Sequence, residues 1–264
     1  MVTNYDQIAD AYIESRDDIP EAFIDNLELR GINISGAKIA DLGCGPGYLS
    51  NTLSEKGAII DAVDPTKKFI EFAKKEFKDN QRVQFLEGTA EKSGLPSQTY
   101  DIVIVMRAWH WFDRDEVIDE VKRVLKPGGF LVIGDAGFTG ATKAVKESMK
   151  IIRKNAQKHS VSSPGTKSYA DQLINNFPVE WFEEWQLARF DLVELFKKEY
   201  KVKYKHEDWM GRLSSVSSLA AFKEKERKET LKKIEKNLIE NVDKNKYKVP
   251  HLMSVAVLEN KNKN

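Results

Sequence analysis

Two acidic residues and the glycines between them are best suited to hold a ligand. The stretch DLGCGPG covers residues 41–47, with glycines at positions 43, 45 and 47. A loop of this kind between a strand and a helix presents backbone N–H groups to a ligand. Its spacing differs from the G-x-G-x-x-G of dinucleotide sites, and it lacks the Gly-Lys-Ser/Thr of a phosphate-binding P-loop. Asp41 instead places a carboxylate at the expected strand end, which suits a ligand that carries an amine or a sulfonium.

A second acid, Asp64, ends the next apolar run. In nucleotide-binding folds, a carboxylate at the end of the second strand accepts hydrogen bonds from ribose hydroxyls. Asp41 and Asp64 together therefore favour a ligand with a ribose and a cationic group over one with a pyrophosphate. S-adenosylmethionine combines adenosine, a sulfonium, an α-amine and a carboxylate, and it carries no phosphate.

Alternating apolar runs and amphipathic segments must position these acids. This alternation predicts an α/β fold whose mostly parallel sheet has helices on both faces, with ligands at the carboxyl ends of the strands. We expect seven strands, the last one antiparallel. The expected strands are 37–42, 58–64, 82–88, 100–106, 128–136, 199–205 and 251–260, and the expected helices include 47–57, 66–77, 115–129 and 218–244.

The chain is expected to divide into three parts. Residues 1–136 would form the ligand-binding core, and residues 137–198 a helical cap insertion. Within that second part, 140–198 has mostly helical patterns with a polar break at 159–168. Residues 199–264 would complete the sheet.

Composition excludes several classes of partner and site. The chain has 264 residues, with 42 Lys and Arg against 41 Asp and Glu, so its net charge of +1 gives no global attraction to nucleic acid or membrane. One cysteine and four dispersed histidines predict neither a disulfide nor a metal site. No signal peptide and no apolar stretch of about 18–20 residues is found. We expect a cytoplasmic protein, and its oligomeric state is left open.

Five landmarks occur in a fixed order along the first half of the chain: DLGCGPG at 41–47, VDP at 63–65, GTAEKSGLP at 88–96, YDIVIVMRAWHWFD at 100–113 and VLKPGGFLVI at 124–133. Together they resemble the class I S-adenosylmethionine-dependent methyltransferases over roughly residues 4–135. The resemblance is closest to the small-molecule subgroup that includes trans-aconitate methyltransferase-like proteins. It implies a Rossmann-like fold, S-adenosylmethionine as cofactor and methyl transfer to a small-molecule acceptor.

The resemblance also implies which residues bind the methionine part of the cofactor. Asp41 would lie near its amine, and Gly43 and Gly45 would let the backbone approach it, since a Cβ would collide. Cys44 occupies a position where this loop often has cysteine, and we interpret it as a small buried filler rather than a nucleophile.

The resemblance also implies contacts to the nucleoside part of the cofactor, from residues 64–66 and from residues 89–91. In the segment 89–91, Thr89 replaces an acid that relatives often have, so its hydroxyl would accept the hydrogen bond from the adenine amino group. Asp64 would bind the ribose. The implied residues are Asp64, Pro65, Thr66, Thr89, Ala90 and Glu91.

The N-terminal segment YDQIADAYIESR resembles the leading helix of the family. Arg16 would grip the methionine carboxylate with two hydrogen bonds, and Tyr12 would line the methyl end. The alternative is that Arg16 is an ordinary surface arginine.

The turn MRAWHW at 106–111 resembles the segment that lines the sulfonium and the acceptor. Met106 and Trp111 are the expected cofactor contacts, since an aromatic ring can face a sulfonium. His110 is the candidate catalytic base, with a packing histidine as the alternative reading. Arg107 could pair with an acidic acceptor.

Other functions stay open beside the small-molecule methyltransferase. Residues 223–248 hold ten Lys and Arg against six Asp and Glu, which is the best feature for a methyltransferase of RNA or protein. A non-catalytic S-adenosylmethionine-binding protein is a further alternative. A nucleotide-binding oxidoreductase is disfavoured by the glycine spacing.

Overall fold

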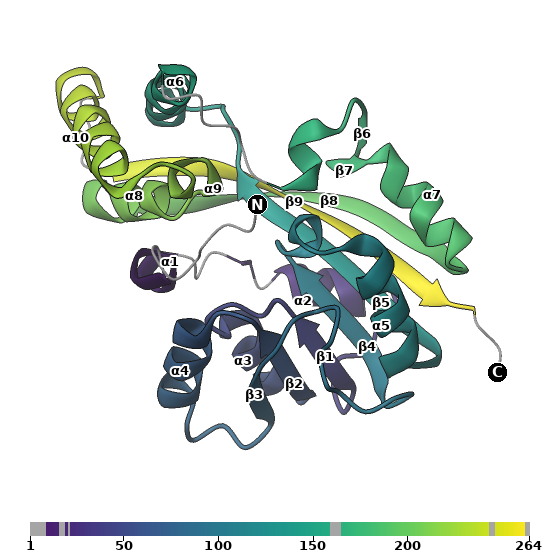
Figure 1. Cartoon of the computed structure of the whole chain (residues 1–264). Coiled ribbons are helices and arrows are strands. Elements are labelled where there is room, and N and C mark those ends of the chain that lie inside the picture. The colour runs from purple at the N-terminus through teal and green to yellow at the C-terminus, as the bar shows by residue number, and fades with distance from the viewer. Residues whose placement is uncertain (1–8, 16–18, 21, 159–164, 243–245, 262–264) are drawn as a thin grey trace. The chain divides into compact units, whose positions relative to one another are not determined.

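The computed structural model describes residues 9–15, 19–20, 22–158, 165–242 and 246–261 (Figure 1). The chain divides into two compact units, each assembled from three separate stretches. Unit 1 comprises residues 1–18, 137–168 and 198–252, and unit 2 comprises 19–136, 169–197 and 253–264. The three-part division expected from the sequence groups the chain differently and stays a prediction.

A seven-stranded sheet with the strand order β3-β2-β1-β4-β5-β9-β8 organises the fold. Neighbouring strands from β3 through β5 pair in parallel, and one strand of the sheet is antiparallel. The predicted Rossmann-like, mostly parallel sheet is therefore confirmed. The strands are β1 (Lys38–Leu42), β2 (Ile59–Asp64), β3 (Val83–Glu87), β4 (Tyr100–Met106), β5 (Leu125–Phe138), β8 (Phe190–Lys205) and β9 (Lys246–Asn260).

Helices connect and flank these strands. They are α1 (Ala9–Ser15), α2 (Ala22–Glu28), α3 (Tyr48–Glu55), α4 (Lys67–Glu76), α5 (Arg114–Val124), α6 (Lys143–Lys158), α7 (Val179–Leu187), α8 (His206–Ser214), α9 (Ser217–Ala220) and α10 (Glu224–Asn241). Short 3₁₀ turns, η2 (Trp109–Trp111) and η3 (Thr166–Tyr169), and a small hairpin of β6 (Leu173–Ile174) and β7 (Phe177–Pro178) complete the described structure.

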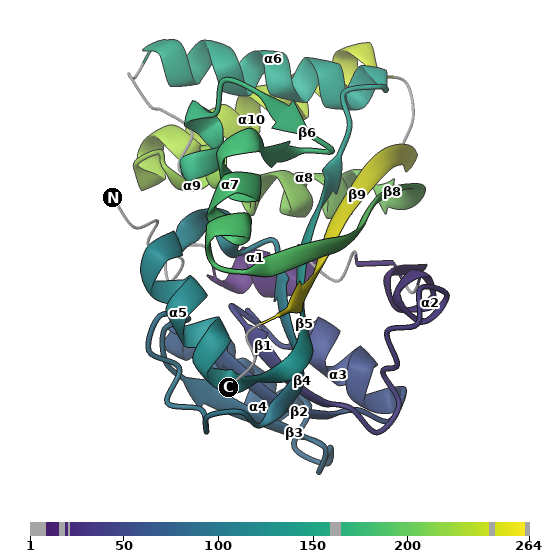
Figure 2. The same ribbon diagram turned by 90° about the vertical axis from the view of Figure 1, so that its right-hand side faces the viewer.

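The two faces of the sheet in unit 2 follow from the alternation of side chains along each strand. On β4, Val103 and Val105 pack with Val117 and Val121 of α5 in one hydrophobic cluster. The aromatic residues of α7 join the same cluster, which makes them part of the core. Figure 2 shows α5 and α3 on opposite sides of β1 and β4. Both faces of the central strands are thus covered, as expected for a parallel sheet.

In unit 1, helices α6, α8, α9 and α10 pack together (Figure 1). Their apolar sides meet Tyr204 of β8 and Tyr247 and Val249 of β9 in a second hydrophobic cluster. Helix α1 packs on α8, where the hydroxyls of Ser15 and Ser215 lie 3.0 Å apart. None of the described helices is long and apolar enough to cross a membrane.

Parts of the second half differ from the sequence-based expectation. The helical expectation for 140–198 is wrong from Phe190 onward, because β8 begins there. Helix α7 ends at Leu187, and Arg189 has a φ of 63°, a left-handed conformation that stops a helix. The charged helix expected at 218–244 is split into α9 and α10.

Gly47 provides a test of how tightly the loop before α3 is packed. Its φ is 84°, and an added Cβ would lie 2.5 Å from Cε1 of Phe85 and 3.2 Å from Cβ of Ala73. We expect Gly47→Ala to lower the free energy of unfolding by about 2–4 kcal/mol, because backbone strain and overpacking add. Gly36→Ala is the matched control, since Gly36 has a φ of 78° and nothing within 4 Å. Urea unfolding that shows equal losses for both variants would contradict the packing argument.

Candidate functional site

The carboxyl ends of four parallel strands meet at one edge of the sheet in unit 2. The backbone N–H groups of Gly43 and Cys44, after β1, donate to the carbonyl of Val63 at 2.8 and 3.1 Å. The N–H of Gly88, after β3, donates to the carbonyl of Asp64 at 3.2 Å. An added Cβ at Gly43 would lie 2.6 Å from Cβ of Ala108, which follows β4. The structure therefore brings four of the sequence-predicted segments together.

The glycine-rich loop requires its glycines for backbone reasons. Gly43, Gly45 and Gly47 have φ values of 75°, 57° and 84°, a region that other residues rarely adopt. At Gly43 the chain itself also leaves no room, because Phe112 lies 3.1 Å from the position of an added Cβ. Packing against the turn after β4 thus requires a glycine at position 43, and the predicted approach of a ligand would be a second reason.

Asp41 is a buried carboxylate at the end of β1, with only 1% of its surface exposed. Burial raises its pKa from 3.8 to about 7, the charge of Asp64 adds to this, and a hydrogen bond from Ser50 opposes it. The hydroxyl of Ser50 donates to Oδ2 of Asp41 at 2.6 Å. Sequence reasoning missed Ser50, although a serine between Leu49 and Leu53 on the buried side of α3 is a recognisable signal.

Asp64 ends β2 and fastens the glycine-rich loop. Its Oδ2 accepts from the N–H of Gly45 at 2.9 Å, and its Oδ1 accepts from the N–H of Thr66 at 2.8 Å. Burial raises its pKa, and these two bonds counteract part of that rise. Each carboxylate oxygen has a second lone pair, so Asp64 can still accept hydrogen bonds from a ligand. Pro65 is exposed and Thr66 is half-buried.

Among the described residues, no cation balances the two carboxylates, and the pKa values of both are raised. Within the described part of the chain, neither Asp41 nor Asp64 has an ion-pair partner, and no cation contributes to the pKa of either. Removing a carboxylate from water is costly unless a counter-charge compensates it. A cationic group of a ligand would supply that compensation.

Cys44 lies between the two acids and is not set up as a nucleophile. Burial raises the pKa of its thiol, and the carboxylates of Asp41 and Asp64 raise it further. The thiolate is the reactive form, so this environment keeps the sulfur inert. The described residues contain no group of three or more His, Cys, Asp or Glu able to hold a metal ion.

The turn after β3 uses its own polar side chains to hold its shape. Oγ1 of Thr89 accepts from the N–H of Lys92 at 3.2 Å, and Oε1 of Glu91 accepts from the N–H of Asp113 at 3.0 Å. Ala90 is buried, whereas Thr89 is exposed. The Thr89 hydroxyl keeps one acceptor site for a ligand, so its predicted adenine contact stays a prediction.

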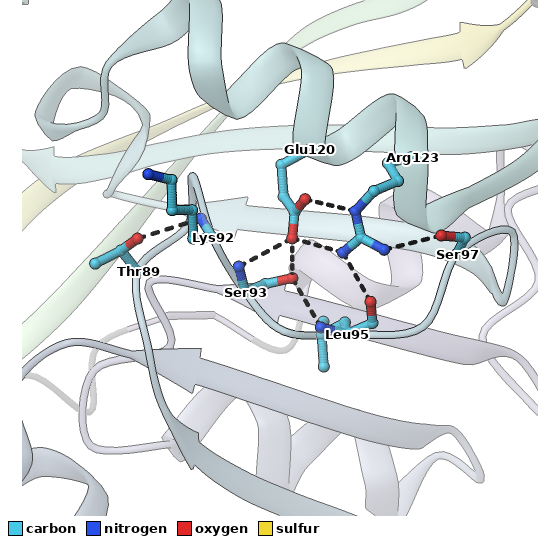
Figure 3. A network of polar contacts seen from close by, with 7 residues as sticks. All are labelled: Thr89, Lys92, Ser93, Leu95, Ser97, Glu120 and Arg123. Atoms are coloured by element: carbon cyan, nitrogen blue, oxygen red, sulfur yellow. Dashed lines mark hydrogen bonds and ion pairs between the residues drawn. The ribbon is translucent and has the colours of Figure 1, made fainter.

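A network of polar contacts anchors the rest of this turn to α5 (Figure 3). Glu120 accepts from both the N–H and the hydroxyl of Ser93, and Arg123 donates to Glu120 at 2.7 and 2.8 Å. Arg123 also donates to the carbonyl of Leu95 at 2.7 Å and to the hydroxyl of Ser97 at 2.9 Å. Burial would raise the pKa of Glu120, but the bonds from Arg123 and Ser93 outweigh it and lower that pKa. Sequence reasoning missed this network.

The turn after β4 separates its aromatic residues. Trp109 is 1% exposed and packs in the core, with its ring centroid 6.4 Å from that of Phe112. Trp111 and His110 are half-buried, and their ring centroids are 4.7 Å apart. Trp111 is thus the tryptophan of this turn that reaches the surface. The catalytic role of His110 and the cofactor contact of Trp111 stay predictions.

Met106 lies on the sheet of unit 2, whereas the two N-terminal candidates, Tyr12 and Arg16, lie elsewhere in the chain. The side chain of Met106 packs over Gly134 of β5, where an added Cβ would collide with its Sδ and Cε. Arg107 has a φ of 60° and donates its N–H to the carbonyl of Gly134 at 2.7 Å. Tyr12 lies in α1 of unit 1, and Arg16 lies outside the described residues. Their predicted contacts with a cofactor stay predictions.

Comparisons with known proteins find similarity to methyltransferases. Residues 40–133 match a family described as a methyltransferase domain. An uncharacterized methyltransferase of Mycobacterium bovis is 36% identical over 131 residues, which cover 50% of this chain and 51% of that protein. The malonyl-[acyl-carrier protein] O-methyltransferase of Halalkalibacterium halodurans is 36% identical over 105 residues, covering 38% and 39%. The chain thus spans about half the length, or less, of these curated relatives.

Among solved structures, a protein of Anaeromyxobacter dehalogenans provisionally described as a type II methyltransferase has a TM-score of 0.62. It is 21% identical and the match covers 91% of this chain and 95% of that one, which establishes the shared fold. The sequence matches and the shared fold agree: residues 40–133 of this chain are similar to methyltransferase domains.

Proposed function

We propose that this protein transfers a methyl group from S-adenosylmethionine to a small-molecule acceptor. The observation that carries the proposal is the pair of buried carboxylates, Asp41 and Asp64, beside a glycine-rich loop without a lysine. A phosphate-bearing cofactor would be repelled by these charges. A cofactor with an amine and a sulfonium would be attracted by them.

The residues present fit this cofactor group by group. Asp41 would accept from the α-amine, which replaces the missing counter-charge. Asp64 would accept from the ribose hydroxyls with the lone pairs that Gly45 and Thr66 leave unused. The turn at Thr89 and Ala90, tied to Asp64 through the N–H of Gly88, would border the adenine.

Catalysis by this chain would rest mainly on positioning. When bound, the cofactor supplies a sulfonium whose methyl carbon is already electrophilic. In an in-line displacement a lone pair of the acceptor would form the new bond to the methyl carbon, and the sulfur would leave with the electron pair of the broken bond as a neutral thioether. Holding the two reactants in line is worth up to about 7–11 kcal/mol in well-oriented reactions. The half-buried ring of Trp111 would face the sulfonium, and where the acceptor carries a proton, His110 would take it.

The acceptor is proposed to be a small molecule that is methylated on oxygen. The relative from Halalkalibacterium halodurans is named as a malonyl-[acyl-carrier protein] O-methyltransferase, which supports oxygen as the acceptor atom. A carboxylate acceptor needs no base. The alternative, methylation of RNA or protein, drew on the lysine-rich helix near the C-terminus. In the structure Ile234 and Leu238 of that helix are buried, and ion pairs such as Lys228–Glu224 offset part of its charge.

A labelling experiment tests the class of acceptor. The protein is incubated with S-adenosylmethionine labelled in its methyl group and with cell extract separated into dialysable and retained fractions. We expect label in products of the dialysable fraction, because the proposed acceptor is a small molecule. Label that appears only in RNA or protein would overturn the proposed acceptor class, and no transfer to any fraction would overturn the proposed activity.

Asp64 is expected to be essential for cofactor affinity. Asp64→Asn keeps the size of the side chain but replaces one acceptor oxygen with a donor, which faces the N–H of either Gly45 or Thr66. Calorimetry should show S-adenosylmethionine binding weakened by about 10–100-fold, since a hydrogen bond to a charged group contributes about 1.5–3 kcal/mol. Asp61→Asn, earlier on β2 and bonded to Tyr100, serves as the control with unchanged affinity. Equal affinities for Asp64→Asn and the unmodified protein would refute the assignment.

Asp41 should make the protein less stable as the pH rises. Its pKa is about 7 in the folded chain against 3.8 for the unfolded group, so the folded state holds a proton that the unfolded state releases between these values. This difference in pKa adds to the free energy of unfolding at pH 4. The contribution decreases as the pH rises and is lost at pH 8, a loss of up to about 4 kcal/mol. Asp41→Asn removes the titration, so it should raise the melting temperature at pH 8 and change it little at pH 4.

The same variant should bind S-adenosylmethionine more weakly at pH 8, because the neutral amide cannot balance the α-amine. Ser50→Ala is the companion variant, since it removes the hydrogen bond to Asp41 without removing the carboxylate. A melting temperature of Asp41→Asn that follows the unmodified protein at every pH would contradict the raised pKa of Asp41.

A further inference from the structure

A positively charged face lies on the β8–β9 ribbon of unit 1, outside the proposed methyl-transfer site. Side chains on the C-terminal part of β8 alternate strictly in exposure, as a strand with one covered side requires. Tyr200, Val202 and Tyr204 are half-buried or buried. The residues between them, Lys201, Lys203 and Lys205, are all exposed.

The N-terminal part of β9 has the same alternation. Tyr247, Val249 and His251 are buried, while Lys246 and Lys248 are exposed. Tyr204, Tyr247 and Val249 belong to the cluster with α6, α8 and α10. The covered side of the ribbon thus faces these helices, and the lysines lie on the other side.

Ring contacts fix how the two strands align. The ring of His251 lies 5.1 Å from that of Tyr200 and 6.0 Å from that of Tyr204. Directly after β8, Nδ1 of His206, the first residue of α8, is bonded to the hydroxyl of Tyr247 at 2.7 Å. Later residues of β8 therefore meet earlier residues of β9, so this part of the ribbon runs antiparallel.

This alignment places lysines beside one another across the two strands. Because His251 lies between Tyr200 and Tyr204, and His206 beside Tyr247, the same offset puts Lys205 next to Lys248. Side chains directly opposite each other in an antiparallel pair are about 5 Å apart. Side chains of residues i and i+2 on one strand are about 6.7 Å apart. We call the five residues Lys201, Lys203, Lys205, Lys246 and Lys248 the lysine face.

Acidic neighbours neutralise the lysine face only in part. Nζ of Lys205 lies 3.8 Å from Oε1 of Glu207, and both side chains are largely exposed, so this pair is weak. Glu199 shares the outer side of β8. Oδ2 of Asp208 accepts from the backbone N–H of Lys205 at 3.0 Å. Five lysines thus stand against three acids.

Folding alone does not account for this arrangement. Like charges directly opposite one another destabilise a sheet. Lysines on an edge strand can prevent pairing with another chain, which would explain those on β8, the last strand of the sheet. Strand β9 lies between β5 and β8 in the strand order. Strand β5 ends at Phe138, and the N–H of Thr139 donates to the carbonyl of Pro250 at 2.8 Å, so Lys246 and Lys248 lie beyond the part of β9 that β5 covers. Protection of an edge does not require Lys205 and Lys248 to lie opposite one another.

We propose that the lysine face binds an anionic membrane surface. Five lysines fall in the range of four to eight with which basic clusters bind anionic lipid headgroups. Their backbone is a sheet packed on a core, which presents the ammonium groups together to a flat surface. Nucleic acid fits less well, because the exposed alternate positions on these strands hold no aromatic residue on which bases could stack. The contact is electrostatic and reversible, and salt weakens it.

Flotation of the full chain with lipid vesicles tests the proposal. Vesicles of phosphatidylcholine with phosphatidylserine are compared with vesicles of phosphatidylcholine alone, at about 0.1 M and about 1 M salt, where the Debye length falls from about 10 to about 3 Å. We expect binding to the anionic vesicles at low salt only. Each lysine near the membrane raises the partition coefficient of the protein onto anionic vesicles roughly fivefold. The triple variant Lys201→Gln, Lys203→Gln, Lys248→Gln should therefore bind roughly a hundredfold more weakly.

A second triple variant with the same change of charge is the control. Lys74→Gln, Lys75→Gln and Lys78→Gln alter three exposed lysines at the end of α4, in unit 2, and should leave vesicle binding unchanged. Circular dichroism checks that both triple variants fold. The proposal is overturned if the protein ignores phosphatidylserine or if both triple variants lose binding equally. It is also overturned if a DNA duplex, and not the vesicles, is retained in a manner that depends on the lysine face.

Discussion

Burial of two carboxylates without a counter-charge is the constraint on which the rest of the site depends. Asp41 and Asp64 stand at the ends of adjacent parallel strands, where the fold itself brings them together. Neutral donors offset part of the free energy that burying the two carboxylates costs. They are the hydroxyl of Ser50 and the N–H groups of Gly45 and Thr66. Neutral donors are weaker than a cation, so the pKa of both acids stays raised. The site is therefore held in a state that a cationic ligand would stabilise.

Glu120 of α5 is a carboxylate whose charge is balanced within the chain, in contrast to Asp41 and Asp64. Glu120 has Arg123 beside it and Ser93 as a further donor, and its pKa is lowered rather than raised. Its charge is satisfied within the protein, so Glu120 serves to fix the turn after β3 against α5. The contrast with Asp41 distinguishes a structural acid from one that is left to meet a ligand. It is the local set of donors, and not the residue type, that separates the two roles.

The first half of the fold could be predicted from the sequence because its signals are local. Buried strands that end at Leu42, Asp64 and Met106 follow from short apolar runs, and parallel pairing places their ends together. The burial of Ser50 could be read from its position on α3, but its bond to Asp41 and the Glu120 network could not, since these partners are set by how α3 and α5 pack on the sheet. The start of β8 was missed because the stretch FDLVELF resembles the amphipathic helix before it. Its strand character comes from pairing with β9, which is distant in sequence.

The charge of the chain illustrates a different limit of sequence reasoning. A net charge of +1 argued against an anionic surface as a partner, because it sums every charge with equal weight. At physiological ionic strength the Debye length is about 8 Å, so an approaching surface responds to the charges closest to it and not to the sum. Alternation along β8 and β9 places Lys201, Lys203 and Lys248 on one side, while many of the acids that balance them lie on other elements. Strand pairing, which composition does not record, thus turns a nearly neutral chain into one with a locally basic face.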